Sequence, residues 1–240
     1  AMLAEGFHSV LPKGSLTVIT NPADDPELWG LAISPDTDAV LYRLAGIFNE
    51  EAHWGVAGET FAMLGMLKGY GEEAWFGLGD KDLATHLLRT RLLRSGMGAA
   101  AVTAELARRL GINASVISMS EQRVRTWVTT PKGRLELQEY FVRERHSLSV
   151  SAVEIEGAKE AVSSPGVAVA LAAADRVFIG PSNPALSIEQ ILADARPPND
   201  PAKTQPVPTE AAGPNPNGPP RAQLLRPRRV PTPQRHTSSR

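Results

Sequence analysis

Apolar residues recur at helical spacing in six segments of the chain, and short apolar runs lie between these segments. The first helix is predicted over residues 1–11. The second begins at Ser34-Pro35-Asp36, where a serine cap, a proline and an acidic residue favour a helix start. The remaining predicted helices are residues 59–68, a helix capped by Asp82, a helix built on Val102, Leu106 and Leu110, and residues 166–174.

Runs rich in valine, isoleucine and threonine predict the strands. They cover residues 16–20, 114–118, 150–155 and 176–179, and a hairpin is predicted from residues 124–130 and 134–143 around Pro131-Lys132-Gly133. Buried apolar strands that alternate with helices are typical of a parallel sheet covered on both faces. The pattern therefore predicts an α/β fold with a mostly parallel sheet, helices on both faces and an antiparallel hairpin.

The periodic pattern stops near Ala193, and the composition changes there. Residues 194–240 hold 12 of the 20 prolines, with eight Lys or Arg against three Asp or Glu. A segment of this kind buries too little apolar surface to offset its ordering entropy. We therefore expect an α/β core over residues 1–193 and a proline-rich, basic, disordered tail over residues 194–240.

Bulk composition removes several classes of function. The formal net charge of -1 gives no general attraction to nucleic acid or to a membrane surface. The absence of cysteine excludes disulfides and thiolate chemistry and suits a cytoplasmic protein. No apolar run approaches the roughly 20 residues that a membrane-spanning helix needs.

Polar segments follow the predicted parallel strands at the edge where α/β sheets bind ligands. Asn21, Asp24 and Asp25 follow the first strand, and Ser182 and Asn183 follow the last. Asp36 and Asp38 lie nearby in the sequence. Clustered acids of this kind can hold Mg²⁺ and assist proton transfer. The alternative is that they are helix caps and solvated turns, and Asp82 has a complete explanation as a cap.

Other candidate side chains carry weaker signals. Ser187 would cap a helix after the Ser-Asn-Pro turn. No two of the five histidines have metal-ligand spacing, and His86 is interpreted as a packed side chain rather than a catalyst. The basic residues between Arg89 and Arg94 are interpreted as the solvated face of an amphipathic helix.

Taken together, these segments resemble the 2-phospho-L-lactate transferase family. The resemblance spans residues 3–192 and rests on TNPADDPELWGLAISPDTDAVLYRLAG, GDKDLATHLLRT, LELQEYFVRER and IGPSNPALSI. It implies a Rossmann-like fold. It also implies transfer of a phospholactyl or phosphoenolpyruvyl group from a guanosine-diphosphate ester to the ribityl hydroxyl of the deazaflavin Fo. GMP is released with the help of Mg²⁺, in the biosynthesis of coenzyme F-420, and the family suggests a homodimer.

The resemblance assigns roles to individual residues. Asp24, Asp25 and Asp36 would be catalytic, and Asp24 and Asp36 would hold Mg²⁺. The implied substrate-binding residues are Asn21, Asp38, Gly79, Asp80, Lys81, Ser182, Asn183, Pro184 and Ser187. Lys81 stands where the family usually has arginine, which keeps the charge and loses the bidentate fork.

Two departures from the family pattern shape the expectations for this chain. The family continues past the Ser-Asn-Pro region with further α/β structure, whereas here the match stops near Ala193 and the proline-rich tail follows. The family also opens with a strand and a glycine-rich loop, whereas this sequence begins with what resembles the following helix. Because the missing strand would be central, we expect low stability for the chain alone. Two other interpretations stay open: a non-catalytic nucleotide-binding regulator of the gluconeogenesis-factor type, which shares the fold, and an inactive fragment.

Overall fold

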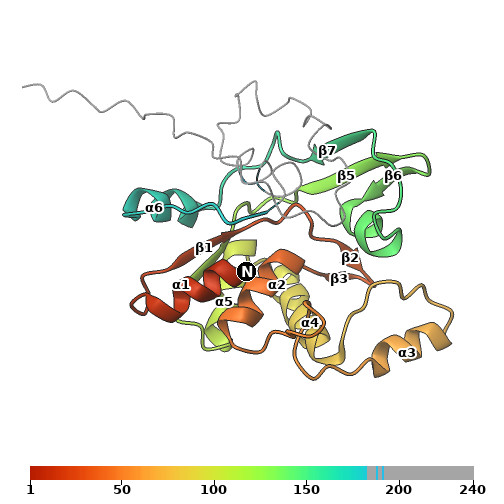
Figure 1. Ribbon diagram of the computed structural model, residues 1–240, viewed down its shortest axis with the longest axis horizontal. Helices are drawn as coiled ribbons and strands as arrows, with labels where there is room; N and C mark the ends of the chain where they lie inside the picture. Colours follow the sequence, from red (N-terminus) through yellow and green to blue (C-terminus); the bar gives the residue numbers. More distant parts are fainter. Residues whose placement is uncertain (183–187, 189–190, 192–240) are drawn as a thin grey trace, which may run out of the picture.

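The computed structural model describes residues 1–182, 188 and 191, and its centre is a parallel pair of strands. Strand β1 (Thr17–Thr20) pairs with β4 (Ser115–Ser118) in parallel, with Thr17 opposite Ser115 and Thr20 opposite Ser118. Both strands match the predicted segments, and neighbouring strands far apart in sequence imply a crossover connection. The α/β class is confirmed (Figure 1).

Helices cover both faces of this parallel pair. Helices α2 (Pro35–Leu44) and α5 (Ala99–Arg109) pack on one face, where Leu41, Val102 and Val116 belong to one buried cluster. Helix α1 (Met2–Val10) lies against α2. Helix α6 (Pro165–Ala173) lies on the opposite side in Figure 1, with Gly166 close to the side chain of Ile117. The predicted covering of both faces is confirmed.

A second sheet is antiparallel and has the strand order β6-β5-β7. Its strands are β5 (Arg125–Thr130), β6 (Gly133–Glu136) and β7 (Ala152–Glu156). The predicted hairpin is confirmed, and Gly133 (φ +110°) makes its turn. The extended prediction for residues 134–143 was wrong at its end, because Glu139–Arg143 forms a helical turn. This turn brings Tyr140 onto the cluster of Val128 and Val153.

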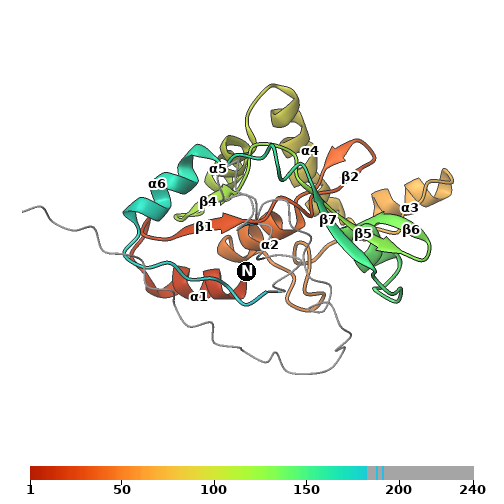
Figure 2. The same cartoon turned by 90° about the horizontal axis from the view of Figure 1, so that it is seen from above.

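A short hairpin missed by the sequence analysis joins β2 (Glu27–Leu28) to β3 (Leu31–Ala32). Its two turn residues, Trp29 (φ +51°) and Gly30 (φ +71°), both have positive φ, as tight hairpin turns require. Helix α3 (Ala62–Gly69) and helix α4 (Asp80–Arg94) follow. Figure 2 shows α3 at the opposite end of the molecule from α6.

The strand predicted over residues 176–179 was wrong. No strand forms there, and Val177, Phe178 and Ile179 are 63%, 58% and 66% exposed. A strand needs a ladder partner, and residues 1–182 supply none at this place. The ring of Phe178 packs instead on Phe7, with 4.8 Å between ring centroids. The predicted tail, residues 194–240, lies outside the described residues.

Candidate active site

Asn21 organises the loop that leaves the carboxyl end of β1. Its side-chain oxygen accepts the N–H of Ala23 at 3.0 Å, which fixes the turn. Its amide nitrogen donates to Asp24 Oδ2 at 3.1 Å and to Asp36 Oδ2 at 3.5 Å. One buried amide therefore draws together two carboxylates that are 12 residues apart in the sequence. The structure thus brings together three of the candidate site residues, Asn21, Asp24 and Asp36.

Asp25 belongs to the same loop and is held by Ser34. The Ser34 hydroxyl donates to Asp25 Oδ2 at 2.7 Å, while the buried oxygen Oδ1 has no hydrogen-bond partner. Burial raises the pKa of Asp25 well above its usual value, and the bond from Ser34 opposes this rise only in part. Ser34 occupies the predicted N-cap position of α2, but its hydroxyl donates to Asp25 and makes no capping bond to the helix.

Asp36 sits in the first turn of α2 and is the most accessible acid of the group. The surrounding protein partly desolvates its carboxyl and raises its pKa, while the Asn21 amide lowers it. Because the residue is exposed, solvent damps this shift. Asp36 therefore combines contact with the loop and access for a ligand.

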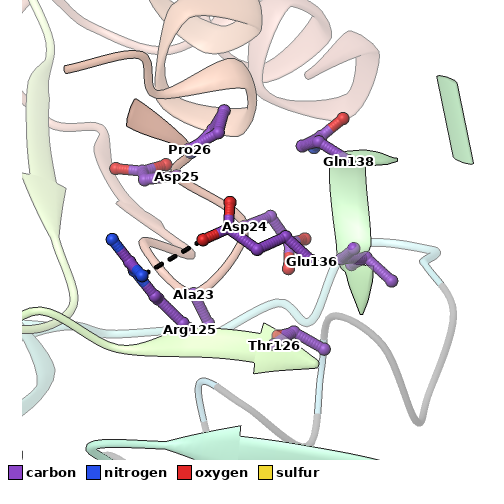
Figure 3. Close-up of a pocket in the computed structure, with 9 residues that line it drawn as sticks. Ala23, Asp24, Asp25, Pro26, Arg125, Thr126, Glu136 and Gln138 are labelled. Atoms are coloured by element: carbon purple, nitrogen blue, oxygen red, sulfur yellow. Dashed lines mark ion pairs between the residues drawn. The ribbon is translucent and has the colours of Figure 1, made fainter. Parts of the chain in front are cut away.

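A hollow of about 10 Å³ lies between this loop and the antiparallel sheet. The dashed line in Figure 3 marks the ion pair beside it, between Arg125 and Glu136, with 3.1 Å between Nη1 and Oε1. The hollow has room for roughly one water molecule next to Asp24 and Asp25.

Asp38, predicted to bind substrate, faces away from this group. Both of its oxygens accept from the Arg89 guanidinium, with 2.9 Å between Oδ2 and Nη1. Asp38 and Arg89 are 4% and 3% exposed. The solvated position expected for Arg89 was therefore wrong, because the buried carboxylate of Asp38 holds it inside.

Asp82 was also wrongly assigned as a helix cap. Helix α4 begins at Asp80 with Gly79 as its N-cap, so Asp82 lies in the first turn and points inward. Its Oδ1 accepts from the Tyr42 hydroxyl at 2.5 Å and lies 3.1 Å from His86 Nε2. Arg89 Nη1 lies 3.0 Å from His86 Nδ1. Burial raises the pKa of Tyr42, so its hydroxyl keeps its proton.

The sequence did carry a signal for this network. Asp82, His86 and Arg89 are spaced i, i+4 and i+7, so they share one face of α4. A polar stripe of this kind, directed into the protein, indicates a buried hydrogen-bonded network rather than a solvated surface. The pairing with Asp38 is not visible in the spacing, because 51 residues separate the partners.

Gly79, Asp80 and Lys81, which were predicted to bind substrate, lie where the residues before α3 and α4 cap one another's helices. Asp80 accepts the N–H groups of Ala62 and Met63 at 3.0 Å each, at the start of α3. The Glu59 carboxylate accepts the N–H groups of Lys81 and Asp82 at 2.8 Å each, at the start of α4. A Cβ at Gly79 would lie 2.2 Å from the Glu59 side chain, so any other residue there would push the Glu59 carboxylate away from its present position.

The Ser-Asn-Pro segment contributes little to the described geometry. Ser182 is exposed, and Asn183, Pro184 and Ser187 lie outside the described residues. Their role in nucleotide binding stays a prediction.

The carboxylate oxygens at the end of β1 are suitable ligands for a magnesium ion. Asp24 and Asp36 bring carboxylate oxygens to one amide, and a buried Asp25 oxygen beside them has no hydrogen-bond partner. Mg²⁺ prefers such oxygen ligands and is commonly held by one or two carboxylates.

No helix among the described residues has the length and apolar character to cross a membrane.

Comparisons with known proteins point to one family. The sequence model described as 2-phospho-L-lactate transferase CofD matches residues 1–194. A phosphoenolpyruvate transferase of Streptomyces avermitilis is 42% identical over 198 residues, which cover 80% of this chain and 62% of that protein. A 2-phospho-L-lactate transferase of Methanosarcina mazei is 36% identical over 191 residues, covering 80% of this chain and 63% of that protein. The chain thus spans less than two thirds of the length of these relatives.

A solved structure shows a similar fold. A UPF0052-family protein from Bacillus halodurans superposes with a TM-score of 0.52 at 17% identity, covering 80% of this chain and 58% of the other. At this identity the likeness concerns the fold alone.

Proposed function

Since the chain belongs to the 2-phospho-L-lactate transferase family, we propose that it acts in the transfer of a phospholactyl or phosphoenolpyruvyl group. The donor would be a guanosine-diphosphate ester and the acceptor the ribityl hydroxyl of the deazaflavin Fo. GMP would be released, in the biosynthesis of coenzyme F-420. Among the relatives are a phosphoenolpyruvate transferase and a 2-phospho-L-lactate transferase, and they support this choice over a non-catalytic regulator.

The observation that carries the proposal is the meeting of acids at the carboxyl end of β1. Asn21 binds Asp24 and Asp36 with one amide group, and Asp25 lies in the same loop. Phosphoryl transfer needs positioning and neutralisation of negative charge more than covalent help from the protein. A group of carboxylates at a ligand-binding edge supplies both when it carries a divalent cation.

Asp24 and Asp36 are the residues proposed to hold Mg²⁺. When bound there, the ion would neutralise charge on the phosphate oxygens of the donor. Asn21 would keep the two carboxylates at a fixed separation, because it contacts both of them. Asp36, which is exposed, would face the substrate.

Asp25 is the proposed proton acceptor. The acceptor hydroxyl oxygen forms a bond to the phosphorus of the phospholactyl group, and the bond from that phosphorus to the GMP oxygen breaks. The hydroxyl proton passes to Asp25, directly or through one water in the adjoining hollow. A carboxyl group whose pKa is raised by burial is a stronger base than a solvated one once it is ionised.

The test is release of GMP from the guanosine-diphosphate ester in the presence of Fo and Mg²⁺. We expect release that stops when either Fo or Mg²⁺ is omitted. Equal release without Fo would indicate hydrolysis, and no release under any condition would contradict the transferase proposal and favour an inactive fragment. A cytoplasmic location and a homodimer stay predictions.

A further inference from the structure

A second pocket lies away from the acid group at β1, between α2, α4 and the loop before α3. Its volume is about 50 Å³, enough for a small polar group and one or two waters. The side chains that give it its character are Tyr42, Asp82, His86, His53 and Trp54, with Gly55 at the rim.

His86 presents an unsatisfied donor to this pocket. The side chain is 1% exposed, and its Nε2 has no hydrogen-bond partner. Because an Arg89 N–H lies 3.0 Å from Nδ1, that nitrogen accepts and the ring hydrogen is assigned to Nε2. Asp82 Oδ1 is 3.1 Å from Nε2 but is not aligned with it for a hydrogen bond. A wholly buried N–H of this kind calls for an acceptor from a ligand or a water.

Asp82 presents an acceptor beside that donor. Its Oδ1 already accepts from Tyr42, and its Oδ2 faces Gly55, where an added Cβ would lie 3.9 Å away. Trp54 supplies an aromatic wall and is held by the bond from its Nε1 to the Gly77 carbonyl at 3.1 Å. The pocket therefore offers one donor and one acceptor next to an aromatic surface.

The rim of the pocket is held in an uncommon backbone conformation. His53 has φ +56°, a left-handed value that non-glycine residues rarely adopt. The loop that carries it is closed by the bond from Asn49 N–H to the Gly55 carbonyl at 3.0 Å. Strained backbone conformations of this kind are common where proteins hold ligands. Here the strained residue lines the same pocket as the unpartnered donor of His86.

A metal ion does not suit this place, although Asp38, Asp82 and His86 bring ligand atoms within 4.8 Å of one another. The Arg89 guanidinium already binds both oxygens of Asp38, and its positive charge would repel a cation. The hydrogen assigned to His86 Nε2 would also block coordination through that nitrogen.

We propose that this pocket binds one neutral group that carries both a hydrogen-bond acceptor and a donor. The group would accept from His86 Nε2–H and donate to Asp82. The inference rests on the proposed function, in which Fo offers two such groups: a hydroxyl of its ribityl chain and the lactam edge of its ring. The pocket would thus fix the acceptor substrate at a point separate from the acids at β1.

The experiment measures binding of Fo to the protein by titration calorimetry, with ribitol and the ribityl-free deazaflavin ring as competitors. We expect His86→Leu to weaken Fo binding at least tenfold, His86→Gln to restore part of it, and His146→Gln, at an exposed site, to change nothing. Competition by ribitol assigns the pocket to a hydroxyl, and competition by the ring assigns it to the lactam.

A second measurement needs no variant. The ¹⁵N signal of His86 Nε2 in the wild-type protein should shift when Fo is added. Fo binding that leaves this signal and the affinity of His86→Leu unchanged would overturn the inference, while GMP release in the same protein would leave the proposed function standing. Absence of any Fo binding would overturn both.

Discussion

Asp36 and Asp38 both lie in the first turn of α2, but they belong to two groups of carboxylates with different surroundings. Asp36 is exposed and shares the Asn21 amide with Asp24, whereas Asp38 is buried and is held by the Arg89 guanidinium. Two positions along a helix turn side chains to different sides, so neighbours in sequence enter different environments. The group at β1 keeps acids accessible to a ligand, and the group around Arg89 uses acids to join α2 to α4.

The difference shows which acids can do chemistry. The Arg89 charge offsets Asp38, and Tyr42 and His86 flank Asp82, so this group forms a network inside the protein. At the end of β1, Asp25 accepts a hydrogen bond from the Ser34 hydroxyl, and burial raises the pKa of Asp25. Acids that burial makes hard to ionise, near an exposed carboxylate, are typical of functional sites.

The largest expected effect comes from removing the buried cation. Arg89→Met leaves Asp38 as an uncompensated charge, so we expect a loss of about 3–5 kcal/mol in the free energy of unfolding. Urea denaturation measures this. Arg91→Met on the exposed side of the same helix is the matched control and should change stability by less than about 0.5 kcal/mol. Equal effects from the two variants would contradict the buried network.

Tyr42→Phe should have the next largest effect. It removes the hydroxyl that donates to the Asp82 carboxylate in a buried place, and a lost bond to a charged group costs about 1.5–3 kcal/mol. Tyr70→Phe serves as the control because Tyr70 is 73% exposed. If Tyr42→Phe lowers the free energy of unfolding no more than Tyr70→Phe does, the Tyr42 hydroxyl contributes nothing to stability.

Asp25→Asn should change how stability depends on pH. In the wild type the pKa of Asp25 lies above its ordinary value of 3.8, so between these two values the folded state binds the proton that the unfolded chain releases. Stability conferred by this proton is present below pH 3.8 and is lost as the pH rises through the folded pKa. Asp25→Asn should therefore match the wild type in acid and be more stable than it at neutral pH.

Urea denaturation at a series of pH values between 3 and 8 gives this comparison. Asp175→Asn at an exposed position is the control and should leave the pH profile unchanged. A wild-type profile identical to that of Asp25→Asn would show that Asp25 ionises in the folded protein as it does in water.

The smallest expected effect concerns a cap at the surface. Glu59→Ala removes the carboxylate that accepts from the N–H groups of Lys81 and Asp82 at the start of α4, and we expect a loss of about 1 kcal/mol. Thermal unfolding compares it with Glu72→Ala, an exposed residue outside this exchange. A loss as large as that of Arg89→Met would mean that Glu59 does more than cap a helix.

Local signals in the sequence predicted much of this fold. Pro35 and Asp36 set the start of α2, and Gly133 set the turn of the antiparallel hairpin, because each acts through its own backbone and nearest neighbours. The sequence also placed Asn21 and Asp24 at the carboxyl end of the first strand, where α/β sheets bind ligands. Asp36 lies in the first turn of α2, and the pattern of the sequence did not predict its contact with Asn21.

The rest depended on partners distant in the sequence. Asp82 was taken for a cap because the start of α4 was placed three residues late, and Glu59, 23 residues away, supplies the carboxylate for that helix. The inward position of Arg89 depends on Asp38, 51 residues away. Residues 176–179 have the composition of a strand but no ladder partner among the described residues, and composition alone does not supply one.

The most direct test of the central claim is the rate of GMP release by Asp36→Asn, in an enzyme whose stability to urea matches the wild type. Asparagine keeps the size of the side chain but removes the charge proposed to hold Mg²⁺ beside the substrate. We predict a fall in rate of at least about 100-fold. A rate equal to that of the wild type would contradict the assignment of the acids at β1 as the active site.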